Sequence, residues 1–83
     1  MMEPFLGEVS LFPYEFDVEG WARCEGQVLP IKDRTALFSL LGTRFGGDGR
    51  SNFGLPKMAP LATSEGAALA YFIAIEGMYP RRR

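Results

Sequence analysis

The segment 35–56, which reads TALFSLLGTRFGGDGRSNFGLP, constrains the fold of this chain more than any other segment. It opens with apolar residues at helical spacing and continues into a loop in which three glycines surround one aspartate. Glycine is used where the backbone takes a positive φ or passes close to a neighbour. The segment therefore predicts a short helix followed by a loop of defined shape. We expect the structural residues of this loop to be Gly42, Gly46, Gly47, Asp48 and Gly49.

The helix is predicted between Ala36 and Leu41, where apolar side chains at i, i+3 and i+4 give one broad buried face. Asp33 is suited to cap its first turn, and Gly42 stands where a left-handed residue ends many helices. A helix of two to three turns is not stable alone. It must pack on a sheet.

Three further regions predict that sheet. Residues 6–12 alternate with a period near two, and residues 21–24 and 27–31 flank the turn signal Glu25-Gly26, which predicts a hairpin. Residues 67–75 are apolar almost throughout, which predicts a strand that is central or lies at an interface. The expected fold class is α+β, a small and mainly antiparallel sheet with one short helix and a Gly-rich loop.

A single core should join these elements. We expect it to contain Trp21, Leu37, Phe38, Leu40, Leu41, Phe53, Leu55 and Ile73.

The length of 83 residues predicts one domain over residues 1–80, followed by a basic tail, Arg81 to Arg83. A chain of this size buries only about 60% of its unfolded surface, yet 47% of its residues are hydrophobic. Its single cysteine, Cys24, cannot form an internal disulfide. We therefore expect subunit association to add burial. The residues expected at or near the contact are Tyr71, Phe72, Ile73 and Met78.

The charge distribution argues against a nucleic-acid partner. Residues 1–80 carry six cationic and ten anionic side chains, whereas binding to a phosphate backbone needs a basic face. No stretch reaches the roughly 20 apolar residues of a membrane span, so no membrane insertion is expected. No signal peptide is visible, and we expect synthesis in the cytoplasm.

The motifs for catalysis and cofactor binding are incomplete. In the glycine loop, Asn52 stands where a dinucleotide fingerprint needs its third glycine, and Leu55 stands where a P-loop needs lysine. Arg50 takes the place of an oxygen ligand in a calcium loop. The chain has no histidine that could activate Cys24 or complete a zinc site. We predict no catalytic residue, no metal and no cofactor, and therefore no enzyme.

The motifs together resemble the phage tail collar domain, a family of structural and adhesive domains found in tail fibres and in bacterial proteins. The resemblance rests on EPFLGE (3–8), GWARCEGQVLPI (20–31), ALFSLLGT (36–43), GGDG (46–49) with Phe53 and Leu55-Pro56, and YFIAIEGMYP (71–80). After Pro56 the chain departs from the family pattern, because Lys57-Met58-Ala59-Pro60 replaces an acidic and Arg-Gly-Arg-like run and the long variable region is missing.

The resemblance implies a structural component of a phage tail fibre or phage-tail-like particle, which mediates subunit assembly or attachment. It implies partners among copies of the chain, in trimers as tail fibres commonly form, and among other tail or fibre proteins. The alternative is a free-standing bacterial binding module of the same fold that recognises a protein or glycan.

Overall fold

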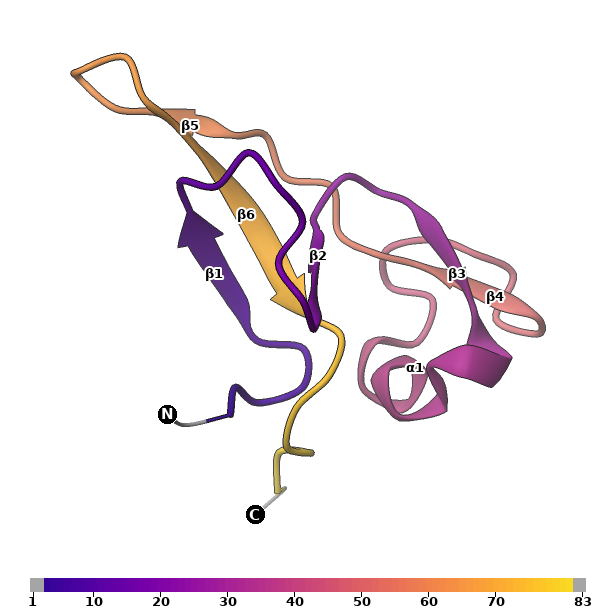
Figure 1. Cartoon of the computed structure of the whole chain (residues 1–83). Coiled ribbons are helices and arrows are strands. Elements are labelled where there is room, and N and C mark those ends of the chain that lie inside the picture. Colours follow the sequence, from indigo (N-terminus) through magenta and orange to yellow (C-terminus); the bar gives the residue numbers. More distant parts are fainter. Residues whose placement is uncertain (1–2, 82–83) are drawn as a thin grey trace.

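The computed structural model describes residues 3–81 (Figure 1). The regular elements in chain order are β1 (Val9–Phe12), β2 (Trp21–Arg23), β3 (Val28–Pro30), the 3-10 helix η1 (Ile31–Asp33), α1 (Thr35–Leu41), β4 (Asn52–Gly54), β5 (Leu61–Ala62) and β6 (Ala68–Ala74). The pairings between these strands are antiparallel. The chain is thus a small α+β protein, as predicted, with its strands divided between two sheets.

Strand β6 is the centre of the larger sheet. Strand β1 pairs along one edge, with Val9 opposite Ile73, and β2 pairs along the other edge, with Trp21 opposite Ala74. Strand β5 pairs with the beginning of β6, so that the two extend as a hairpin away from the rest of the molecule (Figure 1). The strand predicted over residues 67–75 is confirmed. Its apolar composition agrees with the burial of both faces toward its end, where Phe72, Ile73 and Ala74 are buried.

Strand β1 is shorter than predicted because a turn replaces its first part. Gly7 has a φ of 85°, and the amide of Glu8 donates to the carbonyl of Phe5 at 3.0 Å. The strand therefore begins at Val9. The turn places Leu6 in the core, where 8% of it remains exposed.

The predicted hairpin around Glu25-Gly26 is wrong, since β2 belongs to the larger sheet and β3 pairs with β4 in a second sheet. The chain does not reverse here because the segment after β4 runs beside it. The amide of Met58 donates to the carbonyl of Cys24, and the amide of Leu55 donates to the carbonyl of Gln27, both at 2.9 Å. These hydrogen bonds carry the chain from one sheet to the other.

Helix α1 is present, and Gly42 is its C-cap residue as predicted, but the predicted N-cap, Asp33, is wrong. Arg34 occupies the N-cap position without a side-chain hydrogen bond, because Asp33 is the last residue of η1 and the amide of Arg34 closes that turn on the carbonyl of Ile31. At the other end, the amide of Gly42 donates to the carbonyl of Phe38 at 2.7 Å. Gly42 takes a positive φ of 58°, as predicted for this C-cap, while its ψ of −143° differs from the left-handed helical value.

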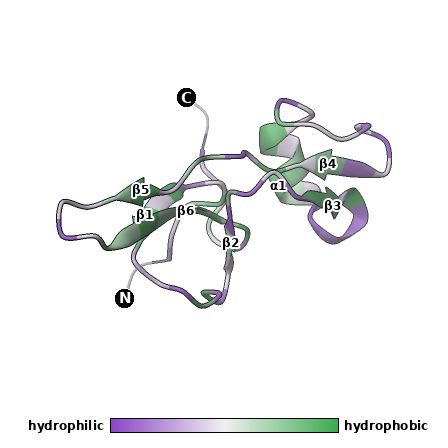
Figure 2. Ribbon diagram, turned by 90° about the horizontal axis from the view of Figure 1, so that it is seen from above, coloured by the Kyte–Doolittle hydropathy of each residue, from purple (hydrophilic) through white to green (hydrophobic). Residues whose placement is uncertain are grey.

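The core lies between the larger sheet and the unit formed by α1, β3 and β4. Viewed from above, these two parts lie at opposite ends of the molecule, with apolar residues on β1, β5 and β6 at one end and on α1 and β3 at the other (Figure 2). The buried cluster consists of Leu6, Cys24, Leu37, Phe53, Leu55 and Ile73. Three further residues of the predicted core pack against it while partly exposed: Phe38, Leu40 and Leu41.

Trp21 lies outside this cluster, contrary to the predicted core. Side chains alternate along β2, and Ala22 is the residue that packs against the cluster. Trp21 instead meets the ring of Phe12 edge to face, with the ring centroids 5.0 Å apart. The tryptophan therefore covers the opposite side of the larger sheet.

That opposite side buries Phe72 within a single chain. The ring of Phe12 lies 5.3 Å from the ring of Phe72, and the guanidinium carbon of Arg23 lies 4.9 Å from the centre of the same ring. Phe72 is 0% exposed and Ile73 is 1% exposed. Neither side chain has surface left for a second subunit, which corrects the expectation that they form a contact. Strand β6 is covered because its two neighbours supply the side chains that one chain was expected to lack.

Leu37 and Leu40 provide a matched test of this core. Leu37→Ala should lower the free energy of unfolding by about 2–5 kcal/mol, because Leu37 is 1% exposed and its loss leaves a cavity. Leu40→Ala should cost less, since Leu40 only packs against the margin of the cluster. Denaturant titration of both variants measures the two losses. Equal losses of unfolding free energy in the two variants would contradict the placement of Leu37 at the centre of the core and Leu40 at its margin.

Candidate functional site

The glycine-rich loop is organised by the carboxylate of Asp48. Its Oδ1 accepts hydrogen bonds from the backbone amides of Arg50 (2.8 Å), Ser51 (2.9 Å) and Asn52 (3.1 Å), and its Oδ2 accepts one from the Ser51 hydroxyl at 3.1 Å. Because these donors favour the charged form, they hold the pKa of Asp48 far below its usual range. The carboxylate is occupied by its own loop.

The glycines allow this loop to lie directly on β4. A Cβ atom on Gly47 would overlap the Cα atom of Phe53, and one on Gly54 would overlap the carbonyl oxygen of Phe45. The amide of Gly54 donates to the carbonyl of Gly46 at 2.9 Å. Close backbone approach therefore explains the glycines, and the loop has one defined shape.

The same loop presents charge and an aromatic ring outward. Arg44 and Arg50 are exposed, and Phe45 is 42% exposed. The ion pairs found within residues 3–81 are Arg23 with Asp17 and Arg34 with Glu76, so neither loop arginine has an ionic partner there.

A ladder of aromatic rings occupies the loop that follows β1. The rings of Phe12 and Tyr14 stack with centroids 5.4 Å apart, and those of Tyr14 and Phe16 stack at 5.1 Å. Phe16 is 63% exposed. This ladder was not predicted, although aromatic residues stand at every second position of FPYEF (12–16).

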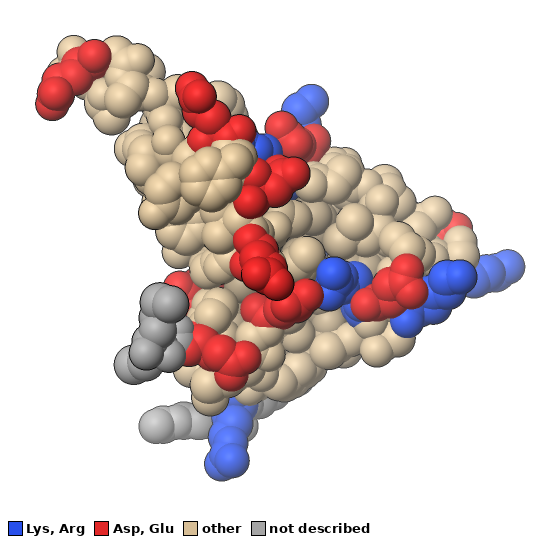
Figure 3. Space-filling view, viewed as in Figure 1, with Lys and Arg blue, Asp and Glu red and all other residues tan. Residues whose placement is uncertain are grey.

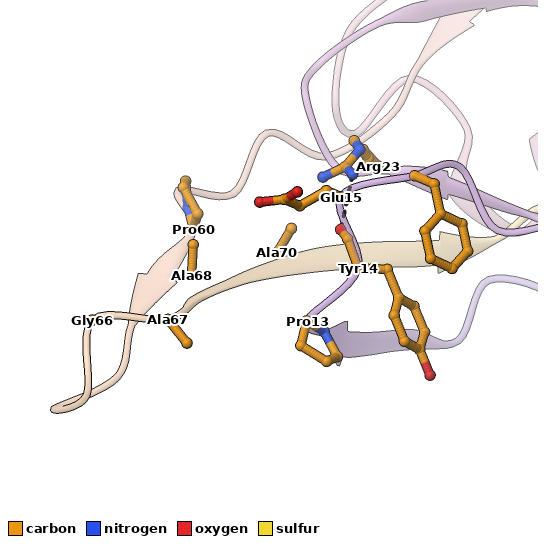
Figure 4. A pocket seen from close by; sticks show the side chains of 10 residues that line it. Pro13, Tyr14, Glu15, Arg23, Pro60, Gly66, Ala67, Ala68 and Ala70 are labelled. Atoms are coloured by element: carbon orange, nitrogen blue, oxygen red, sulfur yellow. Dashed lines mark hydrogen bonds between the residues drawn. The ribbon is translucent and has the colours of Figure 1, made fainter.

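An open groove of about 800 Å³ adjoins this ladder (Figure 4). Glu15 and Arg23 lie on one side, and Pro60 and Ala68 lie across from them (Figure 4). Arg23 is fixed by a hydrogen bond from its Nη2 to the carbonyl of Tyr14 at 3.0 Å. The groove combines one acidic side chain, one basic side chain and apolar walls, a combination suited to holding a ligand in place.

A second cleft of about 720 Å³ lies between the N-terminal segment and β2. Phe5, Phe12 and Trp21 contribute apolar walls, and three glutamates line the cleft: Glu3, Glu8 and Glu19. Glu8 also fixes the turn before β1, since its Oε1 accepts the amide of Phe5 at 3.1 Å. This acidic cleft is thus apolar inside and negatively charged.

Cys24 is buried in the core, and burial raises the pKa of its thiol. A thiol held in its protonated form is a poor nucleophile. Among residues 3–81, no group of three His, Cys, Asp or Glu side chains is arranged to hold a metal ion. Over the same part of the chain, no helix has the length and apolar character needed to cross a membrane.

The residues expected at an interface differ in how far they are exposed to solvent. Met78 is 51% exposed, Tyr71 is partly buried beside the core, and Phe72 is fully buried. Of the basic tail, Arg81 is exposed, while Arg82 and Arg83 lie outside the described residues.

The depressed pKa of Asp48 predicts a pH-dependent contribution to stability. Asp48→Asn keeps an acceptor oxygen but removes the charge, so it should be less stable than the wild type at pH 7. The difference should be complete above about pH 4 and shrink as the pH falls further, because the unfolded carboxylate then takes up a proton that the folded one does not. Thermal unfolding of both proteins at about pH 7 and about pH 2 measures it. A difference that is independent of pH would contradict the role of the charge.

Gly47→Ala should destabilise the protein more than Gly46→Ala. Both glycines have positive φ values, 88° and 122°, and strain from such a conformation costs about 1–3 kcal/mol in each variant. A Cβ at Gly46 would find its nearest atom at 3.9 Å, whereas a Cβ at Gly47 would collide with β4. Denaturant titration compares the two. Equal losses would mean that the loop can move away from the strand.

Comparison with known proteins supports the resemblance noted in the sequence. Residues 7–63 match the phage tail collar domain family, which is more than half of the chain. Searches among curated proteins and among solved structures find no match. The matched region contains β1 to β5, the glycine-rich loop and the segment that links the two sheets. This chain therefore belongs to the phage tail collar domain family.

Proposed function

We propose that this chain is a structural component of a phage tail fibre or phage-tail-like particle, in which it mediates subunit assembly or attachment. The observation that carries the proposal is the collar match over residues 7–63. The glycine loop is consistent with it, because Asp48 is engaged by loop amides rather than directed at a ligand. In this role residues 1–80 act as one collar unit. The chain is made in the bacterial cytoplasm and associates with copies of itself and with other tail proteins.

A particle-association experiment tests this role. The chain with a small epitope tag is produced in its host, and tail or tail-like particles are purified by density gradient. We expect the tag to sediment with the particles and to be located on them by immunogold electron microscopy. A tag that stays with free protein, while particles form normally, would contradict the proposal.

The groove beside the aromatic ladder favours a second candidate function, a free-standing module that recognises a protein or a glycan. Tyr14 and Phe16 expose stacked rings, and Glu15 with Arg23 supplies polar groups beside them. In that case Phe16→Ala should weaken binding to a panel of bacterial surface glycans. Removal of the exposed ring of Phe45, at the far loop, serves as the control. Equal effects of both substitutions would reject the groove as the binding site.

A further inference from the structure

Charge is divided between the two parts of the fold. Residues 3–24, which include β1 and β2, contain five acidic and one basic side chain, whereas residues 25–57, which include α1, β3 and β4, contain three acidic and five basic ones. Figure 3 shows acidic groups gathered over β1 and β2, and basic groups gathered toward the end that holds β3, β4 and α1. Two copies of this chain therefore attract each other when unlike ends meet.

The acidic cleft provides a receiving surface at one end. Glu3 and Glu19 are exposed, and no ion pair within the described part of the chain engages them. Phe5 is 53% exposed at the same cleft. A partner that enters this cleft must therefore combine positive charge with apolar surface.

The glycine-rich loop has that combination. It carries Arg44 and Arg50 on either side of its glycines, together with the exposed ring of Phe45. The Asp48 hydrogen bonds fix its shape before any contact is made, so that little conformational entropy is lost on docking. In Figures 1 and 2 the loop lies with β4, away from β1.

We propose that copies of this chain associate by seating the loop 44–50 of one copy in the acidic cleft of the next. This proposal identifies the two surfaces through which subunits would assemble, and it therefore rests on the proposed function. Each copy has one loop and one cleft on different parts of its surface. Every copy can thus give one contact and receive another, which is how a ring of subunits closes.

Charge reversal on each surface tests the contact. Glu3→Lys with Glu19→Lys reverses the cleft, and Arg44→Glu with Arg50→Glu reverses the loop; these residues are chosen because none of their side chains takes part in a hydrogen bond that holds the fold within residues 3–81. We expect the wild type to be assembled in sedimentation velocity and each reversed variant to associate at least about tenfold more weakly. Raising the salt from about 0.05 M to about 0.5 M should weaken the wild type in the same direction.

A chain that carries all four reversals provides the rescue. Its acidic loop again faces a basic cleft, so assembly should return, whereas independent surface effects would leave it doubly impaired. Glu65→Lys, at the tip of the β5–β6 hairpin, changes charge outside both surfaces and should leave assembly unchanged. Circular dichroism confirms that each variant is folded before it is compared.

Other results of these experiments would contradict either the proposed contact or the proposed function. Sensitivity of the cleft without sensitivity of the loop would show that another segment of the neighbouring copy, such as Arg81 to Arg83, occupies the cleft, and would overturn the proposed contact. If the oligomer persists in all of the reversed variants, assembly uses another surface. That result would also overturn the proposed contact, but it would leave the structural role intact. A wild type that stays monomeric yet sediments with particles would do the same. Absence from particles is the result that speaks against the proposed function itself.

Discussion

The structure depends on how a single strand is covered on both faces. In β6, Ile73 points into the cluster with Leu37 and Phe53, while its neighbour Phe72 points the other way. Phe72 is shielded from solvent because β1 supplies Phe12 and β2 supplies Arg23, whose guanidinium lies over the Phe72 ring. A cation above an aromatic face contributes attraction as well as cover. The alkyl stem of such a side chain can bury apolar surface while its charge remains near water.

The second constraint is the link between the two sheets. Cys24 belongs to both parts, since its amide donates to the carbonyl of Tyr71 at 2.9 Å and its carbonyl accepts the amide of Met58. Its side chain is small enough to lie within the shared cluster. A two-stranded sheet is marginal by itself, so β3 and β4 depend on this link and on α1 for their stability. The residue that resembles a potential nucleophile in the sequence is thus a packing residue at the junction.

Sequence patterns predicted the helix and the strands better than they predicted which strands pair with each other. The helix of segment 36–41 and the strand of residues 67–75 follow from local spacing, and both were found. The hairpin at Glu25-Gly26 failed because strand pairing depends on which distant segment competes for the same backbone groups, and here β4 and the residues after it, up to Met58, occupy them. Asp33 failed as a cap for a similar reason, since a preceding 3-10 turn moved the helix start by one residue. The family match also ends at residue 63, so the central strand β6 had to be recognised from its composition and a resemblance of residues 71–80.

The coverage of β6 changes the physical argument for association. A chain that leaves an apolar strand open would need a partner to remove that surface from water. This chain closes its core by itself, so its remaining apolar surface is spread over separate sites such as Phe5, Phe16 and Phe45. Scattered rings of this kind give only modest burial at any one contact, and specificity then depends on the charges that surround them. Association of this protein should therefore be weaker and more dependent on salt than that of a chain whose core is shared between subunits.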